Sequence, residues 1–260
     1  MRKYWFVFSN ALQSMNEYRL SLALDILGNL ISSLVLYLFW YFLVQSGMNI
    51  GNYTATSLGL YFLTVATIAA TVGFDSHAVA EEIKDGNITQ YLLKPFSYMW
   101  LKFSTTFPHG ILKLIVGILV LVLLAMFGFP VNINPILVIF FVFSLFLAMI
   151  GNYLIYFTTG LGSFWTVQTF GLSAFVSIAS SLVSGRLIPI DLLPSQITMI
   201  SSWLPFRHFV FFPAQIFLGH LSFSEILAGL SFQAIWIIVL YVLTILVWKA
   251  GQKRLEAVGI

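Results

Sequence analysis

Long apolar stretches separated by short polar turns account for most of this chain of 260 residues. Six of the stretches hold roughly 18 or more residues, so each is long enough to cross a hydrocarbon core of roughly 30 Å at about 1.5 Å per residue. They cover residues 21–44, 57–74, 108–127, 136–157, 167–184 and 226–248. The pattern predicts an all-α polytopic membrane protein with six transmembrane helices, folded as a single domain over residues 1–260.

The first residues, 1–19, follow a helical period instead of a continuous apolar run. Placed on a helix, Trp5, Phe8 and Leu12 fall on one side, while Asn10 and Gln13 fall on the other. A helix with one apolar and one polar side lies in the plane of a membrane interface. We therefore expect an interfacial helix ahead of the first span.

The composition excludes a soluble protein, because 60% of the residues are hydrophobic and only 8% are charged. The net charge of +3 reflects membrane orientation and not a nucleic-acid partner, since the basic residues flank the apolar spans. With six spans and the amino terminus inside, ten of the twelve lysines and arginines fall on the inner side. Only Arg186 and Arg207 fall outside. Both termini are therefore predicted to be cytoplasmic.

Residues 75–104, between the second and third predicted spans, carry an unusual concentration of charge. Four of the nine acidic residues of the chain lie between Asp75 and Asp85. Gly86 is expected to end one helix, and Asn87 resembles the start of another. The pattern predicts a rigid charged protrusion in the cytoplasm that suits the docking of a partner protein. The alternative is a solvated helix end at the level of the lipid headgroups.

Residues 185–225, between the fifth and sixth predicted spans, are apolar but too broken to cross a membrane. We expect a pair of short re-entrant or interfacial helices on the outer side, the second of which ends at Gly219. Ser222 and Glu225 have the spacing of a capping box that opens the last span. Four prolines interrupt the segment: Pro189, Pro194, Pro205 and Pro213.

Small residues recur along one face of the fifth predicted span, and they favour close helix packing over the lining of a substrate pathway. The stripe consists of Gly171, Ala174, Ser177, Ser181 and Ser184. Among ionisable residues, only Asp25, Asp75 and Lys113 come near the membrane interior, and we expect all three near the cytoplasmic ends of their spans. An interior without charge suits an amphipathic or lipid-like cargo.

The sequence shows no catalytic machinery and no metal site. It lacks the G-x-x-x-x-G-K-[ST] phosphate loop, so a partner chain is expected to hold any ATP and Mg. Its four histidines lie in separate segments, and it has no cysteine. Two alternatives stay open: a secondary transporter that works without ATP, and a membrane-embedded enzyme that handles lipids.

Two groups of motifs resemble a known family. The inner group has two glutamates, a basic residue and a glycine, followed by Tyr91-Leu92-Leu93-Lys94-Pro95. The outer group comprises Ser184-Gly185, Pro189, Leu193-Pro194, Leu204-Pro205-Phe206, Pro213 and Gly219. In this order they resemble the permease subunits of type-2 ABC exporters, in the branch whose permeases of about 260 residues are often encoded as related pairs beside one ATPase.

The resemblance implies an exporter of the bacterial cytoplasmic membrane whose driving force comes from another chain. It implies a coupling helix, here Glu81 to Leu93, that fits a groove on an ABC ATPase dimer. It also implies an outer gate, here Leu187 to Gly219, and a second permease, identical or related. The ATPase-coupling residues would be Glu81, Glu82, Lys84, Asp85, Gly86, Tyr91 and Leu92. The outer gate would use Pro189, Pro194, Pro205, Phe206, Pro213 and Gly219. The family's cargoes are too varied to name the substrate.

Overall fold

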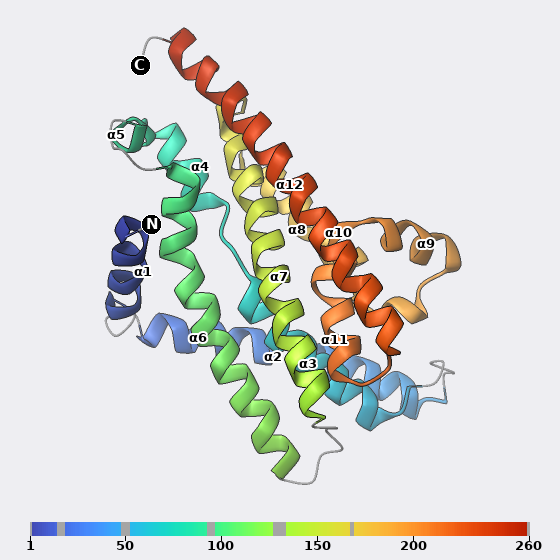
Figure 1. Ribbon diagram of the computed structural model, residues 1–260. Helices are drawn as coiled ribbons and strands as arrows, with labels where there is room; N and C mark the ends of the chain where they lie inside the picture. The colour runs from blue at the N-terminus through green and yellow to red at the C-terminus, as the bar shows by residue number, and fades with distance from the viewer. Residues whose placement is uncertain are drawn as a thin grey trace.

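The computed structural model describes residues 2–14, 19–47, 53–92, 97–126, 134–166 and 169–258. Within these ranges every regular element is a helix, so the all-α prediction is confirmed. Figure 1 shows a bundle of long helices with shorter ones packed on its side and at one end.

Five long helices dominate the described residues. They are α2 (Arg19–Gln45), α3 (Ala55–Val72), α6 (Tyr98–Met126), α7 (Pro135–Leu161) and α12 (Phe223–Val258). The apolar segments built on them are long enough to cross a membrane, which confirms the membrane character that composition predicts. The fifth predicted span corresponds to α8 (Thr169–Val183), whose 15 residues reach only about 22 Å.

The helix α6 begins earlier than predicted. The sequence suggests a start at Pro108, where the ring removes a backbone donor and clashes with the preceding turn at a cost of about 3 kcal/mol. The structure instead has Pro108 inside a helix that starts at Tyr98. The aromatic residues before it explain why, because Phe103 packs on Phe107 at 4.5 Å and on Tyr153 of α7 at 5.2 Å between ring centroids. Residues after Tyr98 therefore belong to the bundle and not to the charged protrusion.

Local capping fixes the starts of two long helices where the sequence predicts them. The Asn134 side chain accepts the backbone N–H of Ile136 at 3.0 Å, and α7 starts at Pro135. At the start of α12, the Ser222 N–H donates to Glu225 Oε2 at 2.8 Å, and the Glu225 N–H donates to Ser222 Oγ at 3.4 Å. This is the predicted capping box.

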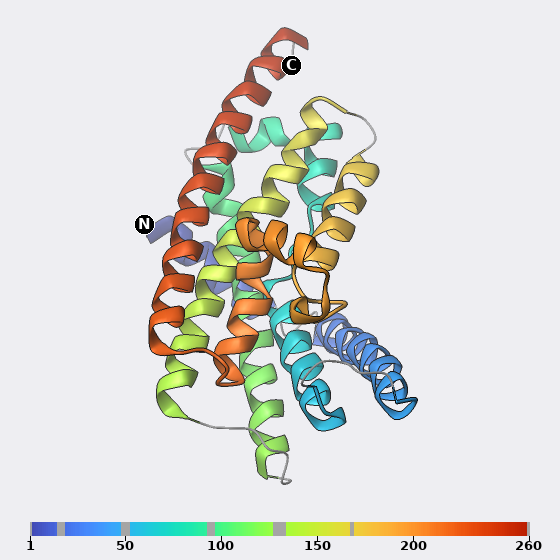
Figure 2. The same cartoon turned by 90° about the vertical axis from the view of Figure 1, so that its right-hand side faces the viewer.

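The core lies around α7, which packs against α12, α3 and the short helices between them (Figure 2). Tyr61, Phe62, Leu145 and Phe209 are among its fully buried side chains. At the edge of the bundle, α2 packs on α3 with most of its apolar side chains exposed. The amino-terminal helix α1 (Arg2–Ser14) packs along α6. Of the predicted interfacial helix over residues 1–19, residues 1 and 15–18 lie outside the described residues, and Arg19 begins α2.

Candidate functional site

The charged protrusion is a corner made of two short helices, α4 (His77–Lys84) and α5 (Ile88–Leu92). Gly86 separates them with a φ of 71°, a conformation that costs residues with a side chain about 1–2 kcal/mol. Its N–H donates to the Ile83 carbonyl at 3.2 Å, as expected where a glycine ends a helix. The predicted helix stop at Gly86 is therefore confirmed. We call the corner of α4, Gly86 and α5 the coupling corner, after the role that the resemblance implies for it.

The coupling corner is packed firmly on the bundle. Val79 and Ile83 of α4 and Ile88 of α5 are buried. Gly160, near the end of α7, lets α4 approach closely, because an added Cβ would lie only 2.8 Å from the Ser76 carbonyl oxygen and from Val79 Cβ. A movement of α4 must therefore also move the end of α7.

Glu82 ties the coupling corner to two long helices. Its Oε1 lies 2.5 Å from Lys102 Nζ, and its Oε2 accepts the Tyr98 hydroxyl at 2.6 Å. Tyr98 in turn stacks on Trp248 of α12, with ring centroids 5.5 Å apart. Burial, followed by the nearby Glu82 carboxylate, raises the pKa of the Tyr91 phenol. Glu82 therefore faces into the protein.

Most of the other polar residues of the coupling corner are exposed. The exposed set consists of Glu81, Lys84, Asp85, Asn87 and Gln90. The predicted coupling residues thus divide into an exposed group and an inward group that contains Glu82. For Leu92 only the backbone is described, and Leu93 to Phe96 lie outside the described residues.

The end of α12 reaches the same end of the molecule as the coupling corner, and α1 lies beside α6 below that corner (Figure 1). The Tyr4 hydroxyl of α1 accepts the Ser97 N–H at 2.8 Å, directly before α6. The last turns of α12 carry Lys249, Lys253 and Arg254 at this end. The charged end of the bundle therefore gathers segments that are far apart in the sequence.

The proline-broken segment forms a short 3-10 helix, η2 (Ile190–Leu192), followed by α9 (Ser195–Trp203), α10 (Pro205–Phe209) and α11 (Phe211–Phe217). It thus contains three α-helices in place of the predicted pair. Met199 and Trp203 of α9 are exposed, whereas every residue of α11 is buried. The surface position predicted for such helices therefore fits α9, and the re-entrant position fits α10 and α11.

Two glycines receive the re-entrant helices. A Cβ on Gly151, near the middle of α7, would lie 2.1 Å from the Phe209 ring, and one on Gly229 of α12 would lie 2.0 Å from the Phe212 ring. Only glycine leaves room for these rings. The segment therefore enters the bundle at Phe209 and returns along α11 to the end from which it came.

A buried glutamine fixes the deepest point of this segment. Gln233 of α12 is fully buried, and its Nε2 donates to the His208 carbonyl at 2.7 Å, while its Oε1 accepts the Ser144 hydroxyl at 3.1 Å. Irregular backbone at membrane depth needs such partners, since water is absent there. Sequence reasoning missed Gln233, although an amide inside an apolar run is a usable signal.

The predicted outer-gate residues differ in their exposure to solvent. Pro189, Pro205 and Pro213 are buried, Phe206 is half-buried, and Pro194 is exposed. Exposed Gly219 has a φ of 72°, and its N–H donates to the Ile216 carbonyl at 3.1 Å, which confirms the predicted stop after the last short helix.

A polar pocket of about 580 Å³ lies beside residues 185–225, which we call the gate segment after the role that the resemblance implies. The Tyr53 hydroxyl donates to Asp191 Oδ2 at 3.0 Å within it. Burial, followed by the charge of Asp191, raises the pKa of Tyr53 well above its ordinary value. This contact joins the start of α3 to η2.

The predicted stripe of small residues on α8 is mostly open within this chain. Gly171 and Ser177 are exposed, and nothing lies within 4 Å of a Cβ added to Gly171. Ala174 and Ser181 are half-buried, and only Ser184 is buried. Packing inside one chain therefore does not account for the exposed residues of the stripe, Gly171 and Ser177.

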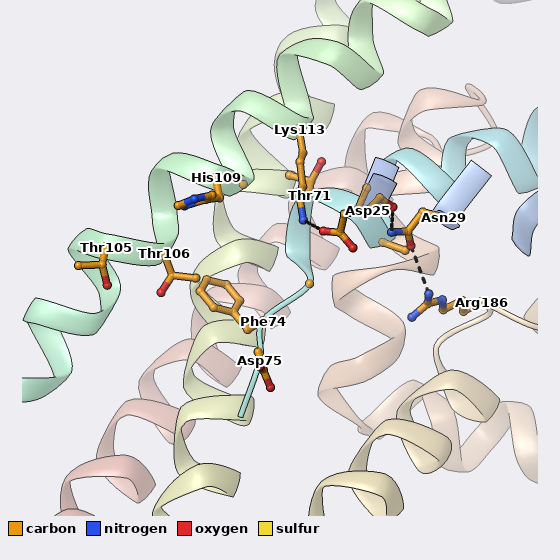
Figure 3. Close-up of a pocket in the computed structure, with 14 residues that line it drawn as sticks. Asp25, Asn29, Thr71, Phe74, Asp75, Thr105, Thr106, His109, Lys113 and Arg186 are labelled. Atoms are coloured by element: carbon orange, nitrogen blue, oxygen red, sulfur yellow. Dashed lines mark hydrogen bonds and ion pairs between the residues drawn. The ribbon is translucent and has the colours of Figure 1, made fainter. Parts of the chain in front are cut away.

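A second polar cavity, of about 500 Å³, lies among α2, α3, α6 and the segment after α8 (Figure 3). Asp25 of α2 forms an ion pair with Lys113 of α6 across it. The Arg186 guanidinium donates to Asn29 Oδ1 at 3.4 Å in the same cavity. We call this space the polar cavity.

The polar cavity corrects two expectations. Lys113 lies midway along α6 and not near one end of it, and Arg186, which charge counting assigns to the opposite side from Lys113, lines the same space. The interior is therefore not free of charge. The pairing of Asp25 with Lys113 lowers the cost of both charges, which explains how a membrane protein tolerates them. Within the described ranges, no three His, Asp or Glu side chains gather as metal ligands.

The geometry is that of a membrane helix bundle with a charged corner at one end, a re-entrant segment and a polar cavity between helices. No curated protein matches the sequence. The family described as ABC-2 family transporter protein matches residues 30–259, which is most of the chain. The chain therefore belongs to the ABC-2 family of transporter membrane proteins.

Proposed function

We propose that this chain is the permease subunit of an ATP-binding-cassette exporter, driven by a separate ATPase subunit that binds ATP and Mg. The observation that carries the proposal is the coupling corner. It presents charged side chains to a partner while its inner face packs on the bundle. A surface of this kind both orients a partner and passes on its movement.

The exposed and inward residues of the coupling corner have different roles in this proposal. Glu81, Lys84 and Asp85 contact the ATPase, whereas Glu82 keeps α4 fixed to α6 through Lys102. When the ATPase dimer closes, α4 moves, and α7 moves with it. The ATPase can shift the permease between its states only to the extent that it binds one state more tightly.

A second permease, identical or related, completes the pathway in this proposal. The exposed face of α8 around Gly171 and Ser177 suits that contact, because small residues let helix backbones approach closely. In this proposal α8 is the fifth of six crossings, and it is the shortest of them. Both termini and the coupling corner lie in the cytoplasm of a bacterium, and the gate segment faces outward.

A pull-down from native membranes tests this function. The wild-type chain is expected to bring down a soluble ATPase, and the Glu81→Lys/Asp85→Lys variant is expected to lose most of it while still inserting in the membrane. Gln196→Lys, an exposed change on α9 of the gate segment, is the control and should bring down as much ATPase as wild type. Equal recovery with the double variant would remove the coupling corner as the docking site.

An ATP-independent secondary transporter is the alternative function. The ion pair between Asp25 and Lys113 supports this alternative, because charges at membrane depth often mark ion pathways. The sequence alone gives this alternative less support, since it places both residues near the ends of their spans. Transport by the purified chain without nucleotide would distinguish it.

A further inference from the structure

Arg186 is the cation of the polar cavity whose bonding capacity is least used. Both ion pairs found in the described residues involve other side chains, Glu82 with Lys102 and Asp25 with Lys113. The contact of Arg186 with Asn29 is long, at 3.4 Å, and its acceptor is neutral. A guanidinium has several N–H donors in a planar fork that matches phosphate and carboxylate oxygens. One end of the cavity therefore offers donors to an anion.

The threonines of the polar cavity offer the opposite chemistry. The Thr71 hydroxyl donates to the Thr67 carbonyl, and the Thr105 and Thr106 hydroxyls both donate to the Lys102 carbonyl. Each hydroxyl has one proton, so only lone pairs remain for a ligand. These groups can accept hydrogen bonds but cannot give them.

Asp75 adds a carboxylate to this accepting side. Its Oδ1 accepts the His77 N–H at 2.8 Å, and no ion pair of the described residues includes it. Figure 3 shows Thr105 and Thr106 on one side, Asp75 below and Arg186 on the opposite side. The two ends of the cavity therefore differ: Arg186 offers hydrogen-bond donors at one end, and Asp75 and the threonines offer acceptors at the other.

Outside the polar cavity, the helices α2 and α6 that help to line it also carry exposed apolar side chains. On α2, Leu24 and Leu27 are 60% and 52% exposed, and on α6, Ile115 and Leu119 are 50% and 56% exposed. In a membrane these side chains contact acyl chains. A ligand that reaches the cavity from the bilayer can therefore place its chains along α2 and α6 while its polar part enters.

We propose that the polar cavity binds the zwitterionic headgroup of a membrane amphiphile, with the phosphate at Arg186 and the ammonium group at Asp75 and the threonine hydroxyls. A purely anionic headgroup would leave Asp75 facing like charge, and a purely cationic one would leave Arg186 without a partner. The inference requires only that the chain lies in a membrane. It stands or falls independently of ATPase docking.

Native mass spectrometry of the full chain in mild detergent tests the inference. Phosphatidylethanolamine is added in one series and phosphatidylglycerol, which lacks the ammonium group, in another. The wild-type chain should retain more phosphatidylethanolamine than phosphatidylglycerol. Arg186→Gln should lower the retention of both lipids by about tenfold or more, since a charge-assisted hydrogen bond to the phosphate is lost. Asp75→Asn should lower the retention of phosphatidylethanolamine only, because it removes the negative charge that faces the ammonium group. The asparagine amide oxygen can still accept the His77 N–H, so the local backbone contact is kept.

Two controls keep the test decisive. Arg254→Gln changes an exposed arginine near the end of α12 and should leave both lipids at the wild-type level. Arg186→Lys keeps the charge and should restore part of the retention if Arg186→Gln proves unstable. Wild-type retention of both lipids by Arg186→Gln would overturn the proposal. The proposal would also be overturned if water-soluble glycerophosphoethanolamine displaced the bound lipid as well as phosphatidylethanolamine itself does, because the ligand would then be a free zwitterion.

Discussion

Lys102 Nζ of α6 lies 2.5 Å from Glu82 Oε1 of α4, with both side chains about four-fifths buried. The pair joins the coupling corner to a long helix of the bundle. We expect Glu82→Ala and Lys102→Ala to destabilise the protein by about 1–3 kcal/mol each, because each leaves a partly buried charge unpaired. The double variant should lose less than the sum of the two. Thermal unfolding in detergent measures this, and strictly additive losses would show that the pair does not couple α4 to α6.

Gly86 is predicted to be needed for its backbone conformation and not for space. Its φ is 71°, and nothing lies within 4 Å of an added Cβ. Gly86→Ala should therefore cost about 1–2 kcal/mol, and Gly86→Asn should cost less, since asparagine tolerates this conformation. The melting temperatures of the two variants test the order. An alanine variant as stable as wild type would mean that the corner is not held in this conformation.

Gln233 should matter for the re-entrant segment more than its single position suggests. Gln233→Leu keeps the size but leaves the His208 carbonyl without its 2.7 Å donor, so we expect a loss of about 1–3 kcal/mol. Gln196→Leu on exposed α9 is the matched control and should change stability by less than about 0.5 kcal/mol. Chemical unfolding of both variants provides the comparison. Equal stability of the two would contradict the role of Gln233.

Two glycines should respond to alanine in opposite ways. Gly151→Ala places a Cβ 2.1 Å from the fully buried Phe209 ring and should cost about 1–3 kcal/mol by overpacking. Gly171→Ala meets no neighbour in the chain and should stabilise α8 slightly, by up to about 1 kcal/mol. If α8 contacts a second permease, Gly171→Ala should nevertheless weaken the dimer. Unfolding and analytical ultracentrifugation of both variants separate these effects, and an unaffected dimer would move the interface elsewhere.

Features that depend on a few neighbouring residues could be predicted from the sequence. Gly86 and Gly219 end helices because of their own backbone freedom, and the caps at Asn134 and Ser222 require only residues two or three positions away. The hydrophobic pattern likewise predicts an all-α membrane protein, because the length and apolarity of a span are local properties.

Features that depend on distant packing could not be predicted. The sequence suggests that Pro108 begins a helix, but packing of Phe103 on α7 continues it upstream. Counting charges assigns Arg186 to the opposite side from Lys113, whereas the tertiary fold places both residues at one cavity. The inward orientation of Glu82 depends in the same way on Lys102.

The central claim is that the driving force reaches this bundle from another chain through the coupling corner. Transport by the purified chain in sealed vesicles, with and without the ATPase that it brings down and with and without ATP, tests this most directly. Cargo should move only when ATPase and ATP are both present, and the Glu81→Lys/Asp85→Lys variant should abolish that movement. Transport by the chain alone, without nucleotide, would contradict the account.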